Sequence, residues 1–107
     1  MVEIITTTTD TIPGKNVIKI LGIVKGSTIR ARHVGRDIAA GFKNLIGGEI
    51  KSYTQMISQS REEAFNRMIN EGNDIGADAI INVRFGTSMV MTGAAEILAY
   101  GTAVKLK

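Results

Sequence analysis

The stretch Glu49–Asn73, EIKSYTQMISQSREEAFNRMINEGN, decides the fold of this chain. Its apolar residues recur at helical spacing along one broad face, and its second half is rich in strong helix formers. Gly47 and Gly48 precede the stretch, and Gly72 lies at its end, where glycine commonly terminates a helix. The sequence therefore predicts one helix of about 25 residues, which would be roughly 37 Å long.

Extended segments precede this helix. Val2–Thr9 and Asn16–Arg32 are rich in β-branched residues and predict two strands, with Ile12–Lys15 as the turn between them. Within the second segment, Gly22 and Gly26 indicate a bulge, a bend or the close approach of another backbone. A hairpin turn at the second glycine is the alternative, and it would divide the segment into two strands.

A shorter helix and two more strands complete the predicted elements. Arg36–Ile46 has helical spacing, whereas Asp78–Met91 and Glu96–Lys107 have strand character after the long helix. The order ββ-αα-ββ predicts a two-layer α+β fold, with a sheet of about four to five strands and two helices. The length fits a single domain, residues 1–107.

Composition narrows the functional classes. The chain has no cysteine, which excludes disulfides, thiolate metal sites and cysteine nucleophiles. No segment approaches the roughly 20 apolar residues of a membrane span, and the N-terminus lacks the pattern of a signal peptide, so we expect a cytoplasmic protein. The net charge is only +3, without a basic run or interleaved aromatic residues, which disfavours nucleic-acid binding.

Both faces of the predicted sheet carry apolar side chains, whereas the helices are expected to cover one face. Alternation places Ile18, Ile20 and Val24 on one face of the second strand, opposite Val17, Leu21 and Ile23. A sheet that is apolar on both faces needs cover on both, and a second subunit would provide it. We therefore predict a homo-oligomeric scaffold or binding protein, whose interface uses the small-residue face of the last strand: Ile97, Ala99, Gly101 and Ala103.

Polar side chains gather where the first strands lead into the helices. This cluster is the candidate site for a small anionic metabolite, and it contains Arg30, Arg32, His33, Arg36, Asp37 and Glu49. A structural ion pair between Asp37 and an arginine is the other interpretation. No nucleophile with an adjacent base is found, so the sequence predicts no enzyme, and it identifies no cofactor.

Three residues are candidate metal ligands. His33 is the only histidine, and Met89 and Met91 lie two residues apart, which places both on one face of a strand. Thioethers prefer soft ions such as copper(I). Packing of the two methionines in an apolar strand is the alternative interpretation.

Four separated motifs resemble those of the YbjQ family, a group of small bacterial and archaeal proteins of unknown function. They are TIRARHVGRD (28–37), GGEIKSY (47–53), GADAI (76–80) and AYGTAV (99–104). The resemblance implies a two-layer α+β fold and assembly with copies of itself into a ring, as a pentamer. It also implies the heavy-metal binding under which the family is catalogued, and it transfers no catalytic residue.

Overall fold

The structure is a computed structural model that describes residues 3–30, 48–91 and 94–107. Within them, four strands form one mixed sheet of order β1-β3-β4-β2, in which β1 is parallel to β3 and the other pairs are antiparallel. The elements are β1 (Ile5–Thr6), β2 (Val17–Arg30), α2 (Gly48–Asp74), β3 (Ala79–Met91) and β4 (Ala94–Leu106). The predicted helix Arg36–Ile46 lies outside the described residues, which contain one helix and thus establish an α+β fold.

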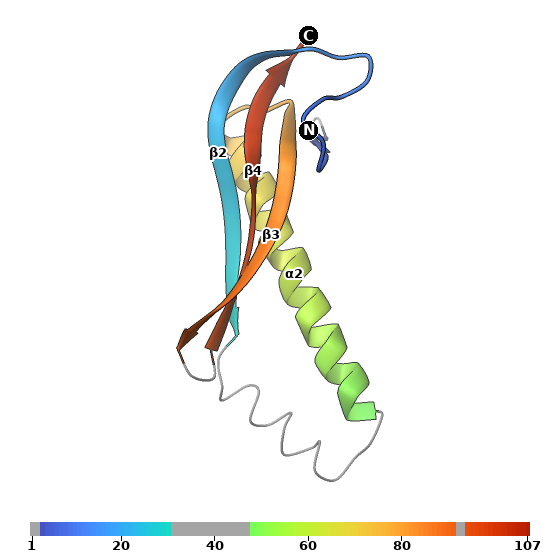
Figure 1. Cartoon of the computed structure of the whole chain (residues 1–107), viewed down its shortest axis with the longest axis vertical. Coiled ribbons are helices and arrows are strands. Elements are labelled where there is room, and N and C mark those ends of the chain that lie inside the picture. Colours follow the sequence, from blue (N-terminus) through green and yellow to red (C-terminus); the bar gives the residue numbers. More distant parts are fainter. Residues whose placement is uncertain (1–2, 31–47, 92–93) are drawn as a thin grey trace.

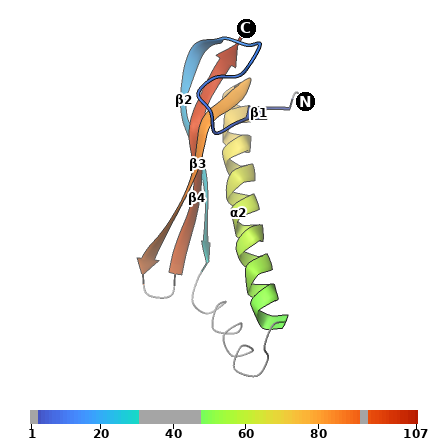
Figure 2. The same ribbon diagram turned by 45° about the vertical axis from the view of Figure 1, so that its right-hand side comes forward.

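The long helix α2 forms the second layer of the fold. Figure 1 shows the strands side by side with α2 behind them, and Figure 2 shows the sheet and α2 as two layers next to each other. Ser60, Ala64 and Met68, spaced by four, are fully buried against the sheet. At 1.5 Å per residue the helix is about 40 Å long, and the molecule measures 56 × 26 × 24 Å. The predicted long helix is therefore confirmed, and it exceeds the width of the domain.

Gly26 brings β2 against the backbone of α2. A Cβ atom at this position would collide with the carbonyl oxygen of Ala64 and the amide nitrogen of Met68. The predicted close approach of another backbone is thus confirmed. The alternative, a hairpin turn here, is wrong, because β2 runs unbroken through Gly26.

Two bulges change which side chains face the helix. In β2 the pairing with β4 shifts between Ile20 and Gly22, and in β3 it shifts around Asn82, which has a positive φ of 53°. Leu21 and Val24 consequently pack in one core under α2. The predicted grouping of Ile20 with Val24 is wrong, because an extra residue in a strand reverses the alternation beyond it.

The small-residue face of β4 lies against α2 of the same chain. Ile97, Ala99 and Ala103 belong to the core under α2, and Gly101 is buried beside Ile80. The prediction of a subunit interface at Ile97, Ala99, Gly101 and Ala103 needs correction here. The close approach that small residues permit is made by the chain's own helix and sheet.

The N-terminal segment covers only one end of the other sheet face. Ile12 packs there with Ala79, Ile81, Val104 and Leu106 in a second, smaller core. The predicted turn Ile12–Lys15 is confirmed by the Lys15 amide, which donates to the Ile12 carbonyl oxygen at 3.1 Å.

The predicted first strand, Val2–Thr9, shortens to β1. The Thr9 amide donates to the hydroxyl oxygen of Thr7 (3.1 Å), and the Thr9 hydroxyl donates to the Thr11 carbonyl oxygen (2.7 Å). Such local hydroxyl bonds compete with strand pairing and curl the chain after β1.

No helix within residues 3–30, 48–91 and 94–107 has the length and apolar character needed to span a bilayer.

Candidate functional site

The predicted polar cluster lies mostly beyond what the structure describes. Arg32, His33, Arg36 and Asp37 fall outside the described residues. Arg30 ends β2 and Glu49 stands in the first turn of α2, and both of these element ends point towards the lower part of the molecule in Figure 1. The anion site at this junction remains a prediction.

The predicted methionine pair is divided by an irregularity in β3. Met89 pairs with Ala95 and is 75% exposed, but the register shifts between Met89 and Met91. The regular alternation on which the prediction relied is therefore interrupted between the two residues. Among the described residues, no group of three or more His, Asp or Glu side chains is positioned to hold a metal ion.

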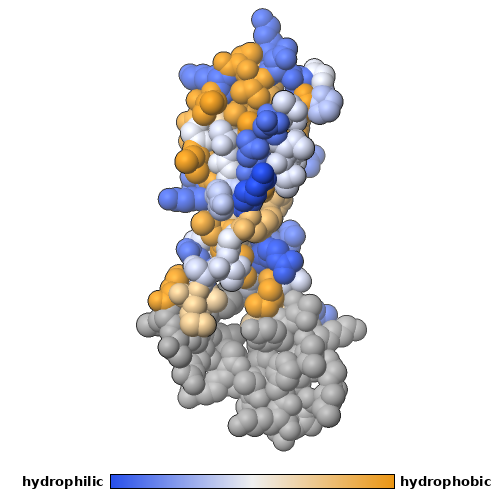
Figure 3. Space-filling view, viewed as in Figure 1, coloured by the Kyte–Doolittle hydropathy of each residue, from blue (hydrophilic) through white to orange (hydrophobic). Residues whose placement is uncertain are grey.

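The outer face, the side of the sheet turned away from α2, exposes apolar side chains to water. Ile23 is 75% exposed, and Ile29 and Tyr100 are also exposed on this face. Lys25 and Arg84 lie among them. Figure 3, which views the molecule from the same side as Figure 1, shows hydrophobic residues reaching the surface between hydrophilic ones. Apolar and charged side chains therefore lie side by side on this surface.

One edge of the sheet is sealed by the N-terminal segment over only part of its length. The Thr7 amide donates to the Ile80 carbonyl oxygen (3.1 Å), and the Val83 amide donates to the Thr7 carbonyl oxygen (3.0 Å). Arg84 Nη1 donates to the Thr8 carbonyl oxygen (3.0 Å). Beyond Arg84, no described residue pairs with this edge of β3. We call the backbone edge of Phe85–Met91 that faces away from β4 the open edge.

The opposite edge of the sheet is β2, whose 14 residues pair only with β4 within the described chain. Arg67 Nη1 of α2 donates to the Ser27 carbonyl oxygen at 2.5 Å. Sequence reasoning missed both arginine contacts because they join residues far apart in the chain. The distances along the chain are 40 residues for Arg67 and 76 for Arg84.

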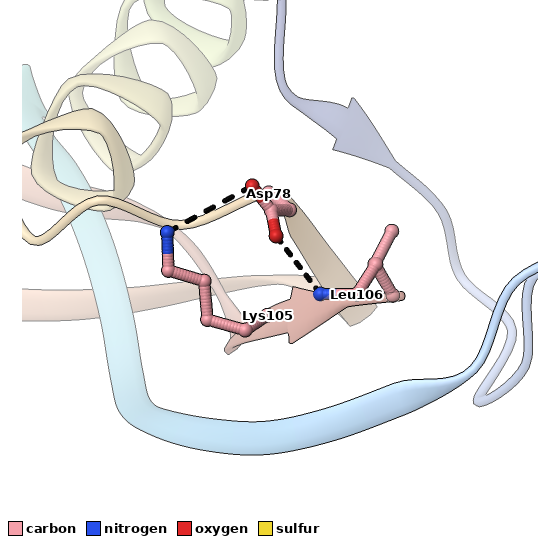
Figure 4. Close-up of polar contacts among 3 residues, drawn as sticks. All are labelled: Asp78, Lys105 and Leu106. Atoms are coloured by element: carbon pink, nitrogen blue, oxygen red, sulfur yellow. Dashed lines mark hydrogen bonds and ion pairs between the residues drawn. The ribbon is translucent and has the colours of Figure 1, made fainter.

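A shallow hollow of about 310 Å³ lies at the other end of the sheet, lined by Glu3, Ile5, Lys15, Asp78, Leu106 and Lys107. Figure 4 shows that Asp78 is already engaged there. Its Oδ2 accepts from the Leu106 amide (2.9 Å), and its Oδ1 lies 3.9 Å from Lys105 Nζ. Asp78 therefore joins the start of β3 to the end of β4, which is a structural role for this residue of the GADAI motif.

Comparisons with known proteins agree with the resemblance in the four motifs. A family model described as "Putative heavy-metal-binding" matches residues 4–107. A UPF0145 protein of Archaeoglobus fulgidus is 61% identical over 105 residues, which are 98% of this chain and 97% of that protein. A UPF0145 protein of Thermosipho africanus is 58% identical over 103 residues, 96% of this chain and 95% of that protein.

A solved structure shares the fold. It is a protein of unknown function from Pediococcus pentosaceus, assigned to the DUF74 family, with a TM-score of 0.64 and 18% sequence identity. The match covers 97% of this chain and 98% of that one. At this identity the similarity concerns the fold alone.

Proposed function

We propose a function from one premise: the chain belongs to the YbjQ_1 family, whose model matches it over residues 4–107. It acts as a homo-oligomeric scaffold or binding protein and not as an enzyme, and its subunits assemble into a ring. The number of subunits, five, rests on the resemblance in the four motifs.

The observation that supports assembly is the amount of surface that one chain exposes. A compact monomer of 11.5 kDa is expected to expose about 5,800 Å². This chain exposes 7248 Å². The excess, about 1,400 Å², is close to two standard interface patches of roughly 800 Å² each. A subunit in a ring buries two different patches, one against each neighbour.

The shape of the chain supports the same proposal. Its radius of gyration is 17.2 Å, whereas a compact domain of this length has about 13 Å. An elongated subunit of two thin layers buries little of its own apolar surface, so contacts between subunits would add substantially to its stability.

Size-exclusion chromatography with light scattering tests the proposal. We expect one species of five times the 11.5-kDa monomer mass at micromolar concentration. A clean monomer would refute the assembly, whereas a different multiple would refute only the number five.

Heavy-metal binding is the second candidate function, because the matched family model carries that description. The donor set of the described residues does not fit a zinc-type site, since it offers no cluster of nitrogen or carboxylate ligands. What remains is the exposed thioether of Met89, a soft ligand that suits copper(I).

This second candidate predicts a saturable, stoichiometric rise in melting temperature when copper(I) is titrated into the protein. The rise should disappear in the Met89→Leu/Met91→Leu variant, which keeps apolar side chains of similar size. Loss of the rise in His33→Ala would instead identify the histidine as a ligand. Titrations of copper(I), zinc and nickel that leave the melting temperature unchanged would reject metal binding.

A further inference from the structure

The open edge of β3 lacks the features that protect sheet edges in soluble proteins. Its sequence, FGTSMVM (85–91), contains no charged residue and no proline. Phe85, Met89 and Val90 are all exposed. Natural proteins protect such edges with lysine, proline or a covering segment, because a free uncharged strand recruits other strands. An edge of this kind is expected to be covered by a specific partner.

The rest of the same edge is covered by the chain itself. Backbone hydrogen bonds join Thr7 to Ile80 and Val83, and the Asn82 amide donates to the Thr9 carbonyl oxygen. Arg84 reaches the N-terminal segment through the Thr8 carbonyl oxygen. Among residues 3–30, 48–91 and 94–107, the protection thus ends where the uncharged sequence begins, and the part of the edge that they leave uncovered is 85–91.

The β2 edge, on the opposite side of the sheet, also has backbone N–H and C=O groups that face away from β4. Arg67 bonds to the Ser27 carbonyl oxygen from outside the β2–β4 ladder, so Ser27 presents its polar backbone to the free side. In an antiparallel pair, every second residue points its backbone N–H and C=O groups away from the partner strand, so Ile23, Lys25 and Ile29 also present these groups to the free side. A carbonyl oxygen has two lone pairs, so the Arg67 bond leaves room for a further donor.

We infer that the open edge of β3 in one copy pairs with the β2 edge of the next copy, so that the sheet continues from subunit to subunit. The inference rests on the proposed assembly and specifies its contact. One repeated head-to-tail contact covers the open edge of β3 together with the Gly26–Arg30 end of β2, which lies at the same height, and it closes into a ring. Pairing of β3 with β3 would leave Ile29 exposed on an unpaired end of β2.

The registers of the sheet indicate which side chains meet. Ile29 of β2 and Ser88 of β3 both pair with Glu96 of β4. They therefore lie at the same height and on the same face of the sheet. A ring with its axis along the strands would bring Ser88 of one copy beside Ile29 of the next, at a Cα separation that a disulfide can span.

Because the native chain has no cysteine, cross-linking tests this contact directly. Ser88→Cys is combined in turn with Ile29→Cys, Ser27→Cys, Lys25→Cys and Ile23→Cys, and each protein is oxidised and run on a denaturing gel. We expect a ladder of covalent oligomers that is strongest with Ile29→Cys, while each single-cysteine variant stays monomeric. A dimer from Ser88→Cys alone would overturn the inference in favour of β3 paired with β3. The absence of cross-links in every combination would also overturn it.

A second experiment does not depend on disulfide geometry. Ser88→Lys/Val90→Lys gives the open edge the charges that guard natural edges, so the mass by light scattering should fall towards the monomer. Asn66→Lys/Asn70→Lys, on the exposed side of α2, adds the same charge and should leave the mass unchanged. Circular dichroism checks that both variants are folded. Unchanged mass in the edge variant would refute this contact but leave the assembly standing, whereas a monomeric native protein would refute the assembly itself.

Discussion

The Gly26→Ala variant is expected to lose about 3 kcal/mol or more of its free energy of unfolding. The added Cβ would meet the Ala64 carbonyl oxygen and the Met68 amide nitrogen, and it would lie 2.6 Å from the Cβ of Arg67. These are backbone or backbone-bound atoms that cannot rotate away, so α2 must lift from β2 as a unit. The lift opens the core at Ala64 and Met68, which are fully buried.

Urea denaturation followed by circular dichroism measures this loss at one fixed protein concentration, because the proposed assembly would make stability depend on concentration. Glu62→Ala is the control, because Glu62 lies on the exposed side of α2 and outside the proposed contact. We expect it to change the free energy of unfolding by no more than about 0.5 kcal/mol. Equal stability of the two variants would show that α2 does not lie as close to β2 as described.

The same glycine shows what the sequence alone could predict. Helical spacing over Glu49–Asn73 and the glycine in β2 are local signals, so they predicted both α2 and the close approach at Gly26. Gly22 was also recognised as a candidate bulge. The phase of the side chains beyond it was still assigned wrongly, because that phase depends on how β2 pairs with β4, about 80 residues away along the chain.

The small-residue face of β4 was recognised correctly, but its partner was not. Small side chains at Ala99 and Gly101 indicate that something approaches closely, and they do not say whether it is a helix of the same chain or another subunit. The structure places the chain's own core there. The large apolar side chains that remain exposed include those on the outer face and at the sheet edges, Ile23 among them.

The candidate contact surface could not be predicted from the sequence, because a strand is an edge only through its place in the sheet. The uncharged run 85–91 is visible in the sequence, yet it would be harmless in a central strand. The order β1-β3-β4-β2, together with the shortness of β1, leaves it open. Both features depend on pairing between distant segments, and the threonines that shorten β1 act through their own local hydroxyl bonds.

The second large effect is expected from Met68→Ala. Met68 is fully buried and is among the largest such side chains in the described chain, in the core that joins α2 to β2, β3 and β4. Truncating Met68 removes apolar contacts and leaves a cavity. The neighbours Gly26 and Ala64 have no side chain, or only a methyl group, with which to fill it. We expect a loss of about 3 kcal/mol within the range known for such truncations.

Thermal and urea unfolding of Met68→Ala should therefore both shift to milder conditions at every protein concentration, which distinguishes a core defect from weakened assembly. Ile75→Ala is the control, because Ile75 is exposed just beyond the end of α2 and belongs to neither core cluster. It should change the free energy of unfolding by no more than about 0.5 kcal/mol. If Met68→Ala were equally mild, the contact between α2 and the sheet would contribute little to stability. The fold would then depend chiefly on subunit contacts, and its unfolding should become strongly concentration-dependent.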